Sequence, residues 1–178
     1  ANDGEATIQG LEVEVQSTIG EHWLVDGSIG NTDFQYVRVP TLQDCLDKGL
    51  PQASCTGLIV VDSNPGRTPE WKAALNVGYI TTLTNGSQLS LRYGITYQDD
   101  TFFGANDDPL TRSPAHSLHN ARLTWSSPDN SWEAALFGTN IRDERAIQSK
   151  LNFLNLFGTV QTTYVRPEEW ALAIKKRF

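Results

Sequence analysis

The chain has 178 residues, a formal net charge of -7 and a hydrophobic fraction of 39%, below the roughly 45–50% of most globular proteins. Its five Trp, five Tyr and seven Phe exclude a disordered chain. The acidic balance argues against binding to nucleic acid, and no apolar run approaches the roughly 20 residues of a membrane-spanning helix. The chain lacks methionine and begins at Ala1, so we expect a processed chain or a fragment of a longer protein.

Apolar and polar residues alternate along much of the chain, which predicts β-strands rather than helices. The clearest stretch is Gln88–Gln98, about twice as long as a typical globular strand. No segment makes a convincing amphipathic helix. We expect seven strands, which in chain order are Ala6–Ile19, Trp23–Tyr36, Trp71–Leu83, Gln88–Gln98, Ser117–Ser127, Trp132–Ile141 and Trp170–Phe178.

The connections between these strands alternate between tight turns and long loops. The turns are residues 20–22, 84–87 and 128–131, and the last two have Asn-Gly and Pro-Asp turn chemistry. The long connections are Val37–Glu70, Asp99–His116 and Arg142–Glu169. Long alternating strands with short turns at one end and long loops at the other are typical of a transmembrane β-barrel. A soluble β-sandwich with core tryptophans is the alternative.

The two faces of the predicted strands differ in polarity. We expect Leu91, Tyr93, Ile95, Leu172 and Ile174 to face lipid, and Arg92, Arg122 and Arg177 to face the lumen. All five tryptophans lie on apolar faces near strand ends, where an aromatic girdle at a membrane interface needs them: Trp23, Trp71, Trp125, Trp132 and Trp170.

An odd number of strands does not make a conventional bacterial barrel, because such barrels have an even number and an open edge leaves backbone groups unpaired in lipid. The chain is therefore expected to be part of a larger barrel. The alternative is a complete small barrel with an eighth strand within Leu151–Tyr164, although the apolar residues there do not alternate cleanly.

The sequence offers few residues for metal binding or catalysis. Cys45 and Cys55 are the only cysteines, and their spacing alone does not distinguish a disulfide from two free thiols. The acidic residues near Asp99 and those at 106–108 are interpreted as a solvated loop rather than a calcium site. No GxSxG, HExxH or phosphate loop occurs, so we expect no enzyme activity, no metal and no cofactor.

Four stretches carry motifs in a fixed order. Asn2–Glu14 follows N-x-G-x-A-x-x-x-G-x-E-x-E, Thr68–Trp71 follows x-P-x-W/H, Trp132–Glu144 follows W-E-x-x-L-x-x-x-N-L-x-D-E, and Pro167–Phe178 is similar to P-P-R-x-Y followed by a terminal Phe. Together they resemble the C-terminal part of the β-barrel of TonB-dependent outer-membrane receptors. Two departures from the pattern matter: Glu168 stands where the family usually has Arg, and Lys176 replaces a common aromatic.

The resemblance implies the last seven strands of a roughly 22-stranded barrel whose lumen is plugged by an N-terminal domain. Residues 1–178 would be one C-terminal barrel segment, without the plug, the TonB box or the earlier strands. It also implies the bacterial outer membrane as location, with Phe178 as the C-terminal assembly signal. The implied partners are the rest of the barrel and plug, the TonB complex, lipid and lipopolysaccharide, the barrel assembly machinery and a small-molecule ligand.

The resemblance further implies active uptake of a scarce ligand, such as a siderophore, cobalamin or a sugar. Loops concentrate binding residues, and the candidates for ligand contact are Tyr36, Arg38, Phe102, Phe103, Phe153, Phe157 and Tyr164. The alternative for each aromatic is packing within its own loop. In an oxidising periplasm we also expect a disulfide between Cys45 and Cys55. The competing function is a complete small outer-membrane barrel with a structural or adhesive role.

Overall fold

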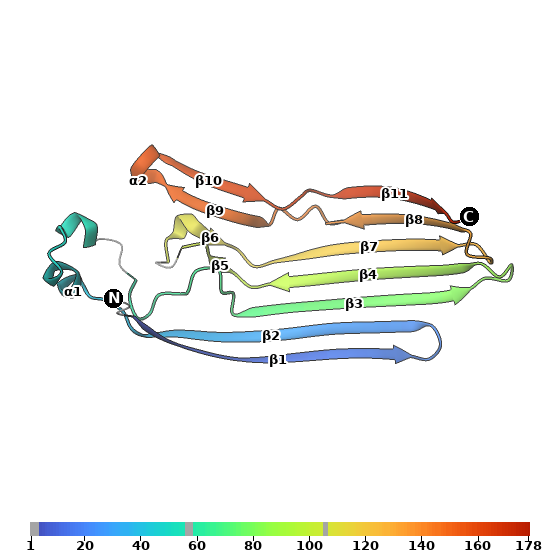
Figure 1. Cartoon of the computed structure of the whole chain (residues 1–178), viewed down its shortest axis with the longest axis horizontal. Helices are drawn as coiled ribbons and strands as arrows, with labels where there is room; N and C mark the ends of the chain where they lie inside the picture. Colours follow the sequence, from blue (N-terminus) through green and yellow to red (C-terminus); the bar gives the residue numbers. More distant parts are fainter. Residues whose placement is uncertain (1–3, 56–58, 105–106) are drawn as a thin grey trace.

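The computed structural model describes residues 4–55, 59–104 and 107–178. Asn2, Asp3 and Asn106, which enter the sequence patterns above, lie outside the described residues. No helix in the described ranges has the length and apolar character needed to cross a membrane. Long strands dominate the molecule, and they lie side by side (Figure 1).

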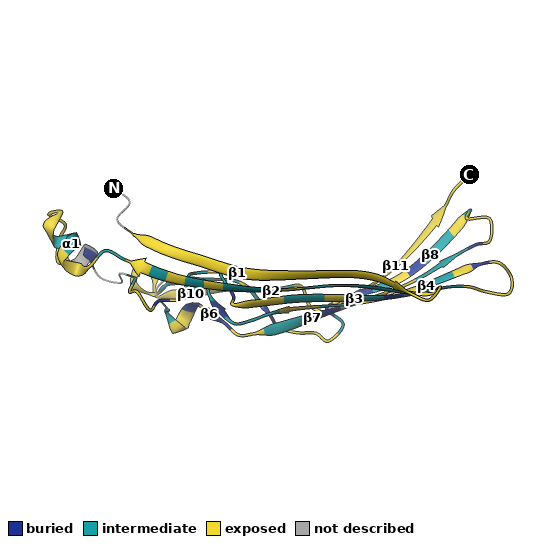
Figure 2. Ribbon diagram, turned by 90° about the horizontal axis from the view of Figure 1, so that it is seen from below, coloured by how far each residue is buried: buried dark blue, intermediate teal, exposed yellow. Residues whose placement is uncertain are grey.

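Seven long strands form one antiparallel sheet, which confirms the predicted all-β fold. They are β1 (Glu5–Ile19), β2 (Trp23–Arg38), β3 (Trp71–Thr82), β4 (Gln88–Gln98), β7 (His116–Ser126), β8 (Trp132–Thr139) and β11 (Glu169–Lys176). Their spatial order is β1-β2-β3-β4-β7-β8-β11. The sheet is a single curved layer (Figure 2), and within the described residues β1 and β11 each have a neighbour on one side only.

The tight turns lie at one end of the sheet and the long connections at the other, and we call these the turn end and the loop end (Figure 1). The long connections are not structureless. The first loop (residues 39–70) contains α1 (Leu42–Asp47) and η1 (Gln52–Cys55). The second (99–115) contains β5 (Thr101–Phe102), η2 (Pro109–Thr111) and β6 (Arg112–Ser113). The third (140–168) contains β9 (Ile147–Phe153), α2 (Leu154–Phe157) and β10 (Thr159–Tyr164).

Two of these loop elements correct the sequence interpretation. β9 and β10 pair with each other in a separate two-stranded sheet, so residues 147–164 form a hairpin and not an eighth strand of the main sheet. α1 was missed because six residues are too few for a helical period. It is held by a capping box, in which Thr41 Oγ1 accepts from Asp44 N at 3.2 Å and Thr41 N donates to Asp44 Oδ2 at 2.7 Å. Hydrogen bonds from Thr41 also lower the pKa of Asp44.

The cross-strand register separates two faces cleanly. One row of paired residues is almost wholly apolar: Ile19, Trp23, Tyr79, Leu91, Leu123, Leu136 and Leu172. The next row, on the opposite face, contains Thr18, Leu24, Gly78, Arg92, Arg122, Phe137 and Ala171. We call the face of Leu91 the outer face and the face of Arg92 the inner face.

The sheet has no conventional core. Among the described residues just four apolar ones are buried: Cys45, Cys55, Ala135 and Ala146. Leu172 and Ile174, on the outer face, are each 68% exposed. A water-soluble protein rarely exposes an apolar surface of this extent, whereas a face in contact with lipid must be apolar.

Side-chain hydrogen bonds close the tight turns. Gly86 adopts φ 82°, which favours glycine, while Asn85 Oδ1 accepts from Ser87 N at 3.0 Å. In the last turn Asp129 Oδ1 accepts from Ser127 Oγ at 2.6 Å and from Ser131 Oγ at 2.9 Å. These bonds lower the pKa of Asp129 to about 2, so its carboxylate is ionised at neutral pH.

Leu91→Arg tests the assignment of the faces. The change is expected to lower the free energy of unfolding by about 2–4 kcal/mol, because it places a guanidinium in hydrocarbon. The matched control is Ser28→Arg on the inner face, where the cross-strand partner is the acidic Glu14, and it should cost under about 1 kcal/mol. Urea unfolding of each variant, as part of a folded barrel in lipid vesicles, measures both. Equal costs, or a reversed order, would mean that the register is wrong by one residue.

Residues 1–178 on their own are expected not to form a closed, stable barrel. β1 and β11 would each expose a row of unpaired N–H and C=O groups to lipid. Refolding the isolated chain in detergent should give aggregates, and co-refolding with strands that can pair with β1 and β11 should rescue it. A monodisperse monomer with heat-modifiable migration would contradict this expectation.

Candidate functional site

The loop end is held together by hydrogen bonds between loops that are distant in sequence. From the first loop, Asn64 N donates to both carboxylate oxygens of Asp107 in the second, at 2.9 and 3.1 Å. From the third loop, Asn152 Nδ2 donates to Asp108 Oδ2. The second loop therefore links the other two, and hydrogen bonds connect all three loops at the loop end of the sheet.

Carboxylates of the second loop act in this network. Asp100 pairs with Arg112 at 3.0 Å, and Asp99 Oδ1 accepts from the Tyr97 hydroxyl at 3.3 Å. Across the described ranges no group of three or more His, Cys, Asp or Glu residues is arranged to hold a metal ion. The acidic residues thus organise the loop.

Tyr36 belongs to an aromatic pair on the inner face at the loop end of β2. Its ring meets that of Phe34 edge-on, with centroids 4.8 Å apart. Phe34 pairs across the strands with Ile8, and Tyr36 pairs with Ala6, so both rings have an apolar neighbour on β1. Sequence analysis did not single out Phe34, although the alternation that places Tyr36 inward also places Phe34 inward.

Phe102 lies close to this aromatic pair although it belongs to another loop. Phe34 and Phe102 both line a hollow of ≈ 180 Å³, whose wall also includes the acidic residues Asp33, Glu70 and Asp99. The backbone of Phe102 is fixed, because its carbonyl accepts from Arg67 N at 2.7 Å. The structure therefore brings Phe34 and Phe102 to one hollow, and Tyr36 contacts Phe34 beside it.

Arginines cover two other candidate aromatics. The Arg67 guanidinium lies 5.8 Å from the centre of the Phe103 ring, and that of Arg145 lies 5.7 Å from the Tyr164 ring. Both pairs form within the loop end. Arg38 is the last residue of β2, where it pairs in register with Glu5.

The remaining two candidates, Phe153 and Phe157, contact each other in the β9–β10 hairpin. Their ring centroids are 6.0 Å apart. Phe157 and its neighbour Leu156 are nonetheless 74% and 75% exposed at the hairpin tip. Phe153 thus supports the hairpin, while Phe157 presents an apolar surface that is separate from the Phe34 region.

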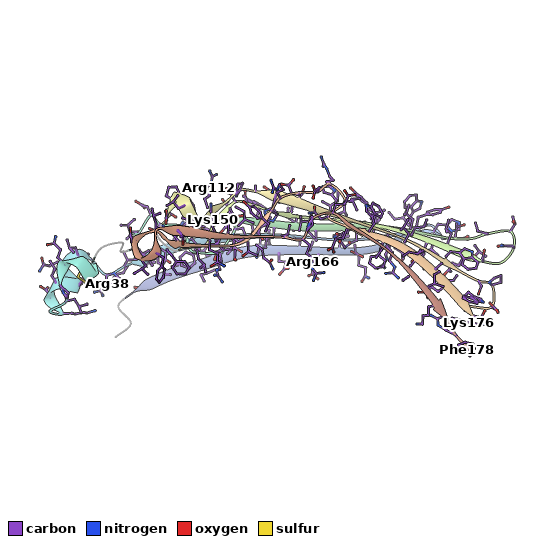
Figure 3. The ribbon with its side chains drawn as sticks, turned by 90° about the horizontal axis from the view of Figure 1, so that it is seen from above. Arg38, Arg112, Lys150, Arg166, Lys176 and Phe178 are labelled. Atoms are coloured by element: carbon purple, nitrogen blue, oxygen red, sulfur yellow. A yellow bond between two sulfur atoms is a disulfide. The ribbon has the colours of Figure 1, made fainter. Side chains whose placement is uncertain are left out.

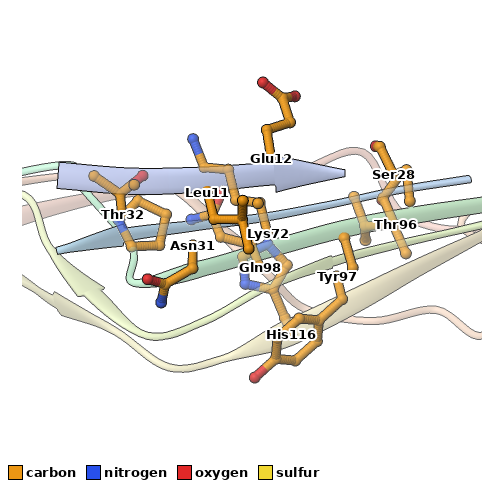
Figure 4. A pocket seen from close by; sticks show the side chains of 16 residues that line it. Leu11, Glu12, Ser28, Asn31, Thr32, Lys72, Thr96, Tyr97, Gln98 and His116 are labelled. Carbon is orange, nitrogen blue, oxygen red and sulfur yellow. The ribbon is translucent and has the colours of Figure 1, made fainter. Parts of the chain in front are cut away.

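The inner face has a second hollow, of ≈ 730 Å³, near the loop end (Figure 4). Its polar wall comes from one cross-strand row, in which Lys72, Gln98 and His116 are successive partners on β3, β4 and β7. Gly30 and Ala74 leave the space open, because their side chains are small or absent. This hollow lies below the loops on the wall that would face a barrel lumen.

Asn140 joins the two ends of the third loop by hydrogen bonds, a role that sequence analysis missed. It is buried at 5% exposure, and its amide nitrogen donates to the carbonyls of Glu144 at 2.9 Å and Arg166 at 3.0 Å. Its φ is 49°, which Asn tolerates better than most residues. It is the Asn of the W-E-x-x-L-x-x-x-N-L-x-D-E pattern, so that pattern marks a loop anchor.

Glu168, which departs from the family pattern, contributes to the same base. Its carboxylate Oε1 accepts from the Trp170 indole Nε1 at 2.6 Å, and its backbone N donates to Asp143 Oδ1 at 3.2 Å. The substitution thus replaces an arginine by a hydrogen-bonded acid at the start of the last strand.

The five tryptophans fall into two groups. Trp23, Trp125 and Trp132 lie at the turn end, at the start of β2, near the end of β7 and at the start of β8. Trp71 and Trp170 lie at the loop end of β3 and β11. The register places all five on the outer face.

Lys176 lies between two aromatic rings at the turn end. Its ammonium is 4.9 Å from the centre of the Trp132 ring and 4.9 Å from that of Phe178. Figure 3 shows Lys176 and Phe178 together at this end, far from Arg112 and Lys150. The replacement of an aromatic by Lys176 is therefore accommodated by cation–π contacts.

Cys45 and Cys55 form a disulfide within the first loop. It joins α1 to η1, and both residues are buried although most of their neighbours are exposed. A loop that lacks an apolar core is thereby held in shape by a covalent bond.

Protein isolated from membranes is expected to contain this disulfide. After alkylation without reductant, mass spectrometry should find Cys45 and Cys55 in one cross-linked pair of peptides, and reductant should release two alkylatable thiols. Two freely alkylated cysteines in fresh, unreduced membranes would contradict the bond. A Cys45→Ser, Cys55→Ser double variant provides the control for the assignment of peptides.

Comparison with known proteins identifies the fold. The ferric yersiniabactin uptake receptor FyuA of Yersinia pestis matches 99% of this chain and 24% of its own, at a TM-score of 0.74 and 13% identity. The ferric preacinetobactin receptor BauA of Acinetobacter baumannii matches 98% of this chain and 22% of its own, at a TM-score of 0.67 and 13% identity. The chain thus spans about a quarter of the length of these receptors.

A search of curated proteins finds no match. The sequence profile described as TonB dependent receptor-like, beta-barrel matches residues 1–141, which covers β1 to β8 and the start of the third loop. Its members are outer-membrane transport receptors of Gram-negative bacteria and not enzymes. The seven-stranded sheet, its two unlike faces and this match agree: the chain belongs to the family of TonB-dependent receptor β-barrels.

Proposed function

We propose that the chain is the C-terminal barrel segment of an outer-membrane receptor that takes up a ferric siderophore. The observation that carries the proposal is the seven-stranded sheet with one apolar and one polar face and with two open edges. The siderophore class is supported by the two similar receptors, both of which are described as receptors for ferric siderophores. In the complete receptor, further strands would pair with β1 and β11 and close the wall.

The positions of the tryptophans support a membrane-spanning orientation. The height of each residue along the membrane normal follows from general barrel geometry. In it, strands rise about 3.3 Å per residue, lie about 4.8 Å apart and are tilted by about 40°. In the register observed, Trp23, Trp125 and Trp132 then come within about 5 Å of one height, and Trp71 and Trp170 within about 5 Å of another. The two levels are about 20 Å apart, close to the roughly 25 Å apolar band of outer-membrane barrels.

Ligand capture is assigned to the Phe34–Tyr36 pair together with Phe102. β2 extends beyond the level of Trp71 and Trp170, which places the rings of Phe34 and Tyr36 outside the membrane. Both rings still point inward. A ligand entering from outside would meet these rings before it reached the hollow lined by Lys72, Gln98 and His116. Aromatic rings offer flat apolar contact to the organic part of a siderophore.

The inner face would contact a plug domain that fills the lumen, and transport would use the TonB complex acting on that plug. Both are supported by membership of the family and by the polarity of the inner face. Phe178, with Trp132 and Lys176 beside it, would serve barrel assembly at the turn end.

Tyr36→Ala tests ligand capture. The variant should weaken siderophore binding to the full-length receptor by roughly fivefold, since loss of an aromatic contact costs about 1 kcal/mol. Gln35→Ala provides the matched control, because Gln35 is adjacent on β2 and faces outward. Binding and uptake of radiolabelled ferric siderophore by intact cells measure both effects.

Deletion of the gene should abolish the uptake of at least one ferric siderophore, and a protonophore should have the same effect on the wild type. If every siderophore tested is still taken up after deletion of the gene, the proposed function is contradicted. Equal binding by the Tyr36→Ala and Gln35→Ala variants would contradict only the assignment of the capture surface.

A further inference from the structure

Two arginines face each other directly on the inner face. Arg92 on β4 and Arg122 on β7 are cross-strand partners, so their Cβ atoms lie about 5 Å apart. Like charges in this arrangement repel and destabilise a sheet. By the same strand geometry, both lie about midway between the two tryptophan levels.

No carboxylate of residues 4–55, 59–104 or 107–178 neutralises the pair. Within the described residues neither arginine forms an ion pair. The inner-face acid Glu133 is already paired with Arg177 at 3.1 Å, and Asp26 accepts from Asn76 Nδ2 at 2.6 Å.

The arginines differ in how firmly they are held. Arg122 Nε donates to Thr124 Oγ1 at 3.2 Å, and its guanidinium lies 5.5 Å from the centre of the Phe137 ring. These contacts use one donor and one face of the group, and they leave the other donors free. The hydrogen bonds and ion pairs described include none to the Arg92 guanidinium.

The surroundings of the pair leave room for a partner. Gly78 lies beside Arg92 across the strands, and a Cβ added there would lie 3.6 Å from Arg92 Cγ. Gly94 follows two residues later on the same face. The cross-strand neighbour of Arg92 is therefore a glycine, which leaves its guanidinium accessible from the lumen, while the Asn76 side chain occupies the space beside Gly94.

We propose that Arg92 and Arg122 together bind a carboxylate of the folded domain that fills the lumen. One carboxylate has two oxygens and can accept hydrogen bonds from both guanidinium groups, which also removes the repulsion between them. Where a folded domain displaces water from this face, a pair of uncompensated positive charges would be costly. This inference rests on the proposed function, because it requires such a domain.

Carbodiimide coupling in the full-length receptor tests the contact. Arg92→Lys and Arg122→Lys keep the charge and supply an amine, which a carbodiimide joins to a touching carboxylate as an amide, while the reagent takes up the water as a urea. Mass spectrometry should show both variants joined to the same Asp or Glu from the segment before residue 1. Thr96→Lys, on the same face of β4 but four residues away, should give at least fivefold less of that product.

Modification of the wild type with phenylglyoxal gives a second measurement that needs no variant. Arg92 and Arg122 should react at least tenfold more slowly than Arg166, whose side chain is 86% exposed. In the carbodiimide experiment, three outcomes would overturn the proposal. They are cross-links to barrel residues alone, no cross-link, and equal yields from all three lysine variants. Protection that appears only after ferric siderophore is added would also overturn it, in favour of a contact with ligand.

The outcomes separate this inference from the proposed function. If siderophore uptake stands and the lysines do not couple to the lumen domain, only the carboxylate contact fails. If deletion leaves uptake unchanged, the proposed function fails, whichever residues are cross-linked. Heat-modifiable migration of each variant shows that the barrel has formed, so a missing cross-link has a structural meaning.

Discussion

Backbone hydrogen bonding in a medium without water is the constraint on which the rest of this structure depends. In hydrocarbon every N–H and C=O group needs a partner from another strand. The seven strands satisfy one another across the sheet, and the turn side chains of Asn85 and Asp129 satisfy groups where strands end. β1 and β11 keep one unpaired side each. These edges are the physical reason for the proposal that the sheet is one part of a larger barrel wall.

Successive side chains of each strand lie on opposite faces of the sheet, so they are in different environments. The outer face can use any apolar side chain, since lipid contact is not specific, and it carries leucines, valines and tyrosines in long rows. The inner face carries the charges and the small residues that shape its hollows. At the loop end this alternation continues along β1 and β2, the two longest strands, so Phe34 and Tyr36 point inward without any special loop conformation. The β2 part of the proposed capture surface, Phe34 and Tyr36, is thus a continuation of the inner face of the sheet.

Sequence analysis predicted the elements that follow a regular period and missed those that do not. The bounds of β4 were predicted to the residue, because Gln88–Gln98 alternates without interruption. The β9–β10 hairpin was missed, since α2 and Gly158 interrupt the alternation between its strands and a register shift follows near Tyr164. α1 depends on one capping box, which is a local signal too short to show a period.

The candidate site was predictable only where one strand supplies it. Tyr36 was found from its position at the end of β2. That its partner Phe34 shares a hollow with Phe102 depends on loop contacts such as that of Arg67 N with the Phe102 carbonyl. The contact between Asn64 and Asp107 joins residues that are 43 positions apart, and no local pattern encodes it. Hydrogen bonds of this kind decide which loop residues meet, so the sequence yields a set of candidates and the structure selects among them.

The contents of the lumen decide what the inner face does. In water, the Arg92–Arg122 pair would be a minor defect, because solvent and ions screen charges at this spacing. Against a folded domain the same pair becomes a strong, localised positive potential that only an acidic group can meet. The acidic side chains of Glu12 and Glu14 lie on β1, across β2 and β3 from Arg92, so they are separated from the arginine pair by two strands. A rigid domain with complementary charges would fit such a wall in one rotational position, and the charge pattern would then fix its orientation as well as its affinity.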